Sequence, residues 1–162
     1  MLRQRSFLYC AILSALALGV ALLSQHAFAL RPCAWCVLQR LVLIAIIIFS
    51  IIGHLGVRYQ HSALRLGAGV AVIATAWGGA IAAWYQHTVA AKLFSCDMTF
   101  ADTVMTQSGL ESALPWLFGI YATCMEASVT MLGVPYAIWA LIFFVLIALI
   151  SVLPLTNLGS QR

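Results

Sequence analysis

Four long stretches of the chain are almost free of charged side chains. They cover approximately residues 6–24, 36–57, 66–85 and 134–155. A helix of about 20 apolar residues spans a hydrocarbon core of about 30 Å. The pattern therefore predicts an all-α fold, an integral membrane four-helix bundle, with residues 1–162 forming a single membrane domain.

The segments between these stretches predict two short loops and one long loop. The short loops lie around residues 25–35 and 58–65, and the long loop covers residues 86–133. Residues 109–121 in the long loop are rich in leucine and aromatic side chains. This composition suits a short helix lying in the membrane interface, and a loop packed on the bundle is the open alternative. The third stretch is rich in alanine and glycine, which favour close helix packing in lipid, and Pro135 suits a first helical turn.

Composition strengthens the membrane prediction. Hydrophobic residues make up 64% of the chain and charged residues 7%, whereas soluble domains carry about 25% charged residues. The lipid bilayer is therefore the expected solvent. The net charge of +4 comes from eight basic residues scattered singly, not from the clustered patch of a nucleic-acid-binding protein, so nucleic acid is excluded as a partner.

The charges also predict which ends of the helices face the cytoplasm. Arginines fall on one side of the predicted hairpins, namely Arg3, Arg5, Arg58, Arg65 and Arg162. All four acidic residues fall in the long loop on the other side, namely Asp97, Asp102, Glu111 and Glu126. Basic residues near membrane ends mark the cytoplasmic face. Both termini are expected inside, and the cysteine-bearing loops outside.

The first stretch also has features of a secretory signal. Arg3 and Arg5 precede the apolar run, and Ala27-Phe28-Ala29 follows it as an A-x-A cleavage pattern. The run is longer than the apolar core of about 7–15 residues that signals usually have. We predict a true first helix, and cleavage would leave the later topology unchanged.

Four of the five cysteines, Cys33, Cys36, Cys96 and Cys124, lie in or beside the predicted outer loops. Disulfides persist outside the cytoplasm and are rare within it. The fifth, Cys10, lies within the first stretch and is expected to be a small buried apolar residue.

The segment Cys33-Ala34-Trp35-Cys36 is a C-x-x-C motif at the start of the second stretch. The motif occurs in redox proteins and in half of a zinc site. Thiolates are stabilised at helix N-termini by unpaired N–H groups and the helix dipole. Arg40 follows one turn after Cys36, and an arginine at the centre of a span costs about 2.5–3.5 kcal/mol. It could snorkel to headgroups, but beside a thiol it is better explained as a cation that stabilises the thiolate or polarises an electron acceptor.

Cys96 and Cys124 lie in the long loop without the spacing of a metal site. A permanent disulfide that staples the loop stays open, as does the connectivity among the four cysteines. Two pairs on one face favour a relay, in which a thiolate of one pair attacks the disulfide of the other. His87, nine residues before Cys96, stays open as an interfacial histidine with satisfied hydrogen bonds.

These motifs resemble the bacterial disulfide bond formation protein B (DsbB) family over essentially the whole chain. Residues 33–40 read CAWCVLQR, similar to the family's C-x-x-C-x-x-x-R signature. His87-Thr88 followed by Cys96-Asp97 looks like the family's second-loop pattern. The resemblance implies an inner-membrane protein-disulfide:quinone oxidoreductase that reoxidises a periplasmic DsbA-like thiol oxidase.

The resemblance also implies a role for each site residue. Cys96 is attacked by the reactive thiolate of the DsbA-like partner, and Cys124 passes reducing equivalents to Cys33 through a transient bond. Cys36 faces the quinone as a thiolate and forms a charge-transfer complex or adduct with it. Arg40 stabilises that complex, and His87 lines the quinone site. The quinone, ubiquinone or menaquinone, comes from the membrane pool, and Gln39 stands where some family members have an acidic residue.

Three other functions fit parts of the pattern. A reductase of the vitamin K epoxide reductase type is also quinone-linked, but it carries its C-x-x-C late and its loop pair earlier, the reverse of the order here. A non-enzymatic copper- or zinc-handling protein needs converging ligands, whereas the chain has one C-x-x-C with no histidine in it. Arg40 beside Cys36 argues against a purely structural protein with two disulfides.

Overall fold

The computed structural model describes residues 2–92 and 98–152 of the chain, and Cys96 lies outside this part. Four long helices form the bundle, which confirms the prediction of an all-α membrane protein. They are α1 (Leu2–Ala27), α2 (Ala34–Arg58), α3 (Ser62–Thr88) and α7 (Tyr136–Val152). The first three are long and apolar enough to cross a membrane, and α7 is a shorter apolar helix of 17 residues.

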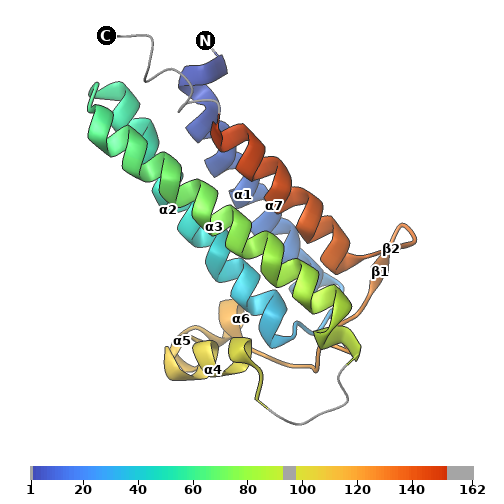
Figure 1. Ribbon diagram of the computed structural model, residues 1–162. Coiled ribbons are helices and arrows are strands. Elements are labelled where there is room, and N and C mark those ends of the chain that lie inside the picture. The colour runs from blue at the N-terminus through green and yellow to red at the C-terminus, as the bar shows by residue number, and fades with distance from the viewer. Residues whose placement is uncertain (1, 93–97, 153–162) are drawn as a thin grey trace.

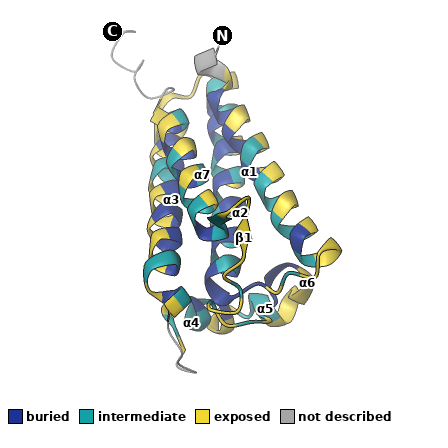
Figure 2. Cartoon of the chain, turned by 90° about the vertical axis from the view of Figure 1, so that its right-hand side faces the viewer, coloured by how far each residue is buried: buried dark blue, intermediate teal, exposed yellow. Residues whose placement is uncertain are grey.

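Neighbouring helices run in opposite directions along the bundle. Figure 1 shows that α1 begins, α7 ends and α2 turns into α3 at the same end of the molecule. Helix α2 packs against α1 and α3, and α3 packs against α7, whereas α1 and α7 have few contacts with each other. Exposed residues lie on the outward helix faces and buried residues between them (Figure 2), as expected when apolar side chains face both lipid and neighbouring helices.

Small residues let α3 approach its neighbours, as its composition predicted. A methyl group added at Gly79 would lie 2.7 Å from ring carbons of Phe144 on α7, closer than atoms can pack. The bundle core around this contact contains Ile46, Val72 and Ile147, all fully buried. Cys10 is also fully buried there, with its Sγ 3.5 Å from Ser151 Oγ, in agreement with the role expected for it.

The long loop folds into short helices at the opposite end of the bundle from the start of α1 (Figure 1). After a single 3-10 turn, η1 (Ala90–Lys92), these are α4 (Phe100–Gln107), α5 (Leu110–Ala113) and α6 (Pro115–Phe118). Leu117 and Phe118 are buried with Val37 of α2, whereas Trp116 is 55% exposed. The aromatic segment thus packs one face on the bundle and leaves the other free for the membrane interface.

A small β-hairpin replaces the predicted first turn of the fourth helix. Strands β1 (Thr130–Met131) and β2 (Val134–Pro135) pair antiparallel, and α7 begins only at Tyr136. Leu132 and Gly133 turn the chain with φ angles of 55° and 79°. Val134 and Pro135 therefore belong to a strand, and the helix starts later than residue 134. The predicted end at residue 155 lies outside the described residues.

Candidate active site

The two cysteines of the C-x-x-C motif lie at the start of α2. Cys33 is the N-cap residue, in extended conformation, and Cys36 lies in the first turn. Their Sγ atoms are 3.1 Å apart and both thiols are free. This distance is too long for a disulfide bond of about 2.05 Å but short enough for a hydrogen bond. The pair is therefore in the dithiol form, with its sulfur atoms close enough to be oxidised to a disulfide after a small movement.

Aromatic side chains hold the motif in place. The ring of Trp35 lies 4.8 Å from that of Tyr85 on α3 and 6.5 Å from that of Phe100 on α4. Trp35 is buried in the same cluster as Cys33. The motif is thus packed between the bundle and the long loop, which limits the movement of both sulfur atoms.

The long loop brings a third cysteine to the motif. The Tyr121 N–H donates to the Pro32 carbonyl over 3.0 Å, which ties the long loop to the residue before Cys33. Cys124 packs on the buried cluster of Cys33 and hydrogen-bonds its thiol. The hydrogen bonds with Cys124 and with Cys36, together with burial, raise the pKa of the Cys33 thiol. These contacts therefore favour the neutral thiol form of Cys33.

Two buried glutamines lie against the sulfur atoms. Gln86 on α3 donates its Nε2 to Cys36 Sγ over 3.1 Å and to Cys33 Sγ over 3.7 Å. Gln39 on α2 donates to Gln86 Oε1 over 2.7 Å. Each glutamine side chain is only 5% exposed.

Arg40 is buried between α1, α2 and α6. Only 4% of Arg40 is exposed. Its guanidinium group donates to Gln25 Oε1 over 2.5 Å, to Leu117 O over 2.8 Å and to Ala21 O over 3.4 Å. All three acceptors are neutral oxygens, so these bonds leave the positive charge of Arg40 uncompensated. A cation held in this way favours negative charge or a polarisable acceptor nearby.

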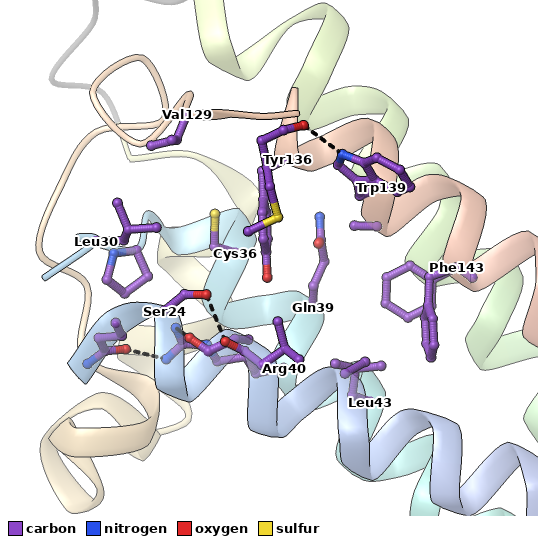
Figure 3. Close-up of a pocket in the computed structure, with 18 of the residues that line it drawn as sticks. Ser24, Leu30, Cys36, Gln39, Arg40, Leu43, Val129, Tyr136, Trp139 and Phe143 are labelled. Carbon is purple, nitrogen blue, oxygen red and sulfur yellow. Dashed lines mark hydrogen bonds between the residues drawn. The ribbon is translucent and has the colours of Figure 1, made fainter. Parts of the chain in front are cut away.

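Cys36, Gln39 and Arg40 all line one cavity of about 500 Å³ between α1, α2 and α7. Figure 3 shows these three side chains together with Tyr136 and Trp139 of α7. The rest of the lining is largely apolar. Leu16 and Val20 of α1 and Ile142 of α7 line the cavity and are each more than half exposed. The cavity therefore reaches the outer, lipid-facing surface of the bundle between α1 and α7.

Nearly the whole chain is similar in sequence to known proteins. The family model described as disulfide bond formation protein DsbB matches residues 3–154. The chain belongs to the DsbB family. The disulfide bond formation protein B of Polaromonas sp. strain JS666 is 32% identical over 158 residues, which cover 94% of this chain and 89% of that protein. The protein of the same name from Herminiimonas arsenicoxydans is 31% identical over 139 residues, which cover 86% of each chain.

Within this DsbB-family chain, the structure brings together four of the six residues that the sequence singled out. Cys33, Cys36 and Cys124 meet at the N-terminal end of α2, and Arg40 follows one turn after Cys36. Cys96 lies outside the described residues. His87 lies in the last turn of α3 and is not among the described residues that line the cavity, so its contact with a quinone stays a prediction.

The sequence analysis missed Gln86, Gln25 and Tyr136. Gln86 contacts both sulfur atoms, Gln25 holds Arg40, and Tyr136 lines the cavity. Gln86 falls in the predicted long loop, because the predicted third span ends at residue 85, whereas α3 continues to Thr88. Tyr136 carried no signal, since tyrosine is common wherever a helix meets the interface.

Proposed function

We propose that this protein is a thiol:quinone oxidoreductase of the bacterial inner membrane. In this proposal it reoxidises a periplasmic dithiol oxidase of the DsbA kind and passes the electrons to a membrane quinone, ubiquinone or menaquinone. Membership of the DsbB family supports a role in disulfide bond formation. Both termini face the cytoplasm and the cysteine-bearing loops face the periplasm.

One observation carries the quinone part of the proposal: Cys36 and Arg40 line a largely apolar cavity that reaches the lipid. A quinone supplies a flat apolar ring whose carbonyl oxygens accept hydrogen bonds and which takes up two electrons and two protons. The lining of the cavity suits such a ring. Arg40 and the Tyr136 hydroxyl offer donors for the carbonyl oxygens, and Cys36 offers the electron donor.

The cysteines act in a fixed order. The partner's thiolate attacks the Cys96–Cys124 disulfide at Cys96, and Cys124 leaves as a thiolate. Cys124 then attacks Cys33 in the Cys33–Cys36 disulfide, and Cys36 leaves as a thiolate beside the cavity. The contact between Cys124 and Cys33 supports this second exchange. The partner's second thiol then releases Cys96, which attacks Cys124, so that the Cys96–Cys124 disulfide forms again and Cys33 leaves as a thiolate. A quinone in the cavity would take up two electrons and two protons from Cys33 and Cys36, whose disulfide then also forms again.

Arg40 holds the negative charge that develops in the cavity. Its guanidinium group is already fixed by three neutral oxygens, so no side-chain ordering is needed when the acceptor becomes reduced. Preorganised charge of this kind is the largest contribution in many active sites.

The test mixes the purified protein in lipid nanodiscs with a quinone and a reduced DsbA-like protein, and follows quinone absorbance. Quinone is reduced at the expense of the partner's thiols. Cys36→Ser folds and inserts but loses quinone reduction, and Cys96→Ser no longer forms a covalent complex with the partner. Quinone reduction that persists in Cys36→Ser, in folded protein, contradicts the assignment of Cys36.

A further inference from the structure

Two glutamine amides are buried between α2 and α3, next to the thiols. Gln39 and Gln86 are separated by 47 positions in the chain, yet the Gln39 Nε2 donates to Gln86 Oε1 over 2.7 Å. Burying a primary amide in a membrane bundle is costly unless its polar atoms are hydrogen-bonded. The burial of the two amides therefore has to be explained by the atoms that their remaining N–H groups contact.

The remaining donors of Gln86 are directed at sulfur. Its Nε2 lies 3.1 Å from Cys36 Sγ and 3.7 Å from Cys33 Sγ. The bond from Gln39 fixes this orientation, because a reversed Gln86 amide would place its N–H groups against the N–H groups of Gln39 and its oxygen against the sulfur atoms. Gln39 thus keeps the donating side of Gln86 toward the thiols.

We propose that Gln86 is a further catalytic residue, which stabilises the Cys36 thiolate by direct N–H donation, and that Gln39 is its positioning residue. This inference rests on the proposed function, since it concerns the same exchange. When the Cys124 thiolate bonds to Cys33 and the Cys33–Cys36 bond breaks, the electron pair of that bond stays on Cys36. The Gln86 N–H is in place to receive this charge.

The structure separates this role from that of Arg40. Three of the five Arg40 N–H groups donate to Gln25, Leu117 and Ala21, and none donates to Cys36 within the described part of the chain, so Arg40 acts on Cys36 through its charge. Gln86 is the side-chain N–H donor in direct contact with Cys36 within the described part of the chain. An amide donates at every pH, whereas a carboxyl group in its place would donate only when protonated.

The experiment measures alkylation of Cys36 in the reduced full-length protein, without quinone or partner, by N-ethylmaleimide between pH 5 and pH 10. Gln86→Met removes the donor and keeps the length of the side chain. At neutral pH its alkylation is about tenfold slower than that of the wild type, because hydrogen bonds to charged groups are worth more than neutral ones. At high pH, where the thiol is ionised in both proteins, the two rates converge. The variant leaves the charged and titratable neighbours of Cys36 unchanged. These are Cys33, Arg40 and Tyr136, with Cys124 in contact with Cys33.

A double-mutant cycle tests the role of Gln39. Gln39→Met slows alkylation in the wild-type background by a smaller factor, about threefold, and has no further effect in Gln86→Met, because Gln39 acts only through Gln86. Gln107→Met, at an exposed position at the end of α4, is the matched control and alkylates as the wild type does. If Gln86→Met does not fold, Gln39→Met alone decides the matter, and wild-type alkylation in folded Gln39→Met then overturns the proposal.

Three results would overturn the proposal. The first is folded Gln86→Met whose Cys36 is alkylated at the wild-type rate, and the second is a slower rate in Gln86→Met that remains slower at high pH. The third is a decrease caused by Gln39→Met that is equally large in the wild type and in Gln86→Met. Quinone reduction by the wild-type protein is measured in parallel. A wild type that reduces no quinone contradicts the proposed function, whereas a wild type that does so with an unaltered Gln86→Met alkylation curve contradicts only this inference.

Discussion

Arg40 is a buried cation whose three hydrogen bonds go to neutral oxygens of α1 and α6. A buried charge without a counter-ion costs free energy, and a chain that only needed to fold would gain from an apolar residue here. Arg40 lies in the cavity wall beside Cys36. The proposed function accounts for the cost, since in it a negative charge develops at this place during each turnover.

Replacing Arg40 by methionine is therefore expected to separate stability from activity. Arg40→Met lowers kcat/KM for quinone by about tenfold or more, because a charged hydrogen-bond donor is lost, while thermal stability changes little, because an apolar side chain replaces a desolvated charge. Steady-state quinone reduction and thermal unfolding in detergent measure the two effects. Arg58→Met, at an exposed position at the end of α2, is the control with unchanged kinetics. Equal loss in both variants would rule out a specific role for Arg40.

Among individual site residues, the sequence predicts those that belong to a recognisable motif and misses those that do not. The C-x-x-C spacing and a lone arginine one turn later are visible in the chain, so Cys33, Cys36 and Arg40 were found. Gln86 meets the sulfur atoms only because α3 packs on α2 at that register. Helix register is a property of tertiary packing, which the sequence pattern does not encode locally.

Packing between helices depends on single glycines. Gly79 on α3 faces the Phe144 ring, and an added methyl group would lie 2.7 Å from it, whereas Gly78, one residue earlier, has nothing within 4 Å. The two glycines thus share a helix and differ only in the face they occupy.

Gly79→Ala and Gly78→Ala form a matched pair. Gly79→Ala lowers the free energy of unfolding by about 1–3 kcal/mol through overpacking. Gly78→Ala raises it by about 0.5–1 kcal/mol, because alanine has the higher helix propensity. Thermal and denaturant unfolding in detergent measure both changes. Destabilisation of equal size in the two variants would show that the α3–α7 contact is not what Gly79 provides.

The turn that carries Cys124 is held by a carboxylate. Glu126 Oε2 accepts from the Thr123 N–H over 3.0 Å and from the Thr123 hydroxyl over 3.1 Å. The hydrogen bond from the Thr123 backbone, followed by that from its hydroxyl, lowers the pKa of Glu126 below its ordinary value. When folding lowers the pKa of a carboxyl group, the group stabilises the folded state at every pH above its ordinary, unfolded-state pKa. This stabilisation is lost as the pH falls through the lowered, folded-state pKa.

The protection of this turn against hydrogen exchange is therefore expected to fall on acidification. Protection factors of the amides in residues 123–128, corrected for intrinsic exchange, decrease from pH 6 toward pH 3. In Glu126→Gln they are lower at pH 6 and no longer depend on pH over this range. Glu111→Gln in α5 is the control and leaves the curve unchanged. A pH dependence that survives in Glu126→Gln would assign the effect to another group.

Element boundaries were predicted least well where the backbone leaves the common conformations. The apolar run beginning at Val134 favours a helix, but the positive φ angles of Leu132 and Gly133 fold the chain into the β1–β2 hairpin. A leucine in the left-handed region gives no local sequence signal, since that region is usually occupied by glycine or asparagine. The hairpin then supplies Met131 to the cavity wall, so part of the candidate site was also hidden from the sequence.

Across the whole molecule, two environments meet at the first turn of α2. The long loop delivers Cys124 from the side of the short helices, and the cavity approaches Cys36 from the lipid-facing gap between α1 and α7. The few contacts between α1 and α7 are what leave room for this cavity. In the proposed function, the bundle separates the access route of the water-soluble thiol protein from that of the lipid-soluble acceptor, and the Cys33–Cys36 pair lies between the two routes.

A narrower cavity is consequently expected to weaken the binding of quinone without slowing thiol exchange with the partner. Ala140 of α7 lines the cavity, and Ala140→Phe adds a ring that competes with the acceptor for space, raising KM for quinone by about tenfold. Reduction of the Cys33–Cys36 pair by the partner, followed by alkylation without quinone, keeps its wild-type rate, because Cys33 and Cys124 meet outside the cavity lining. Leu149→Phe, on the same helix at a lipid-facing position that is 63% exposed, is the control with unchanged kinetics. An unaltered KM in folded Ala140→Phe would place the acceptor elsewhere on the bundle.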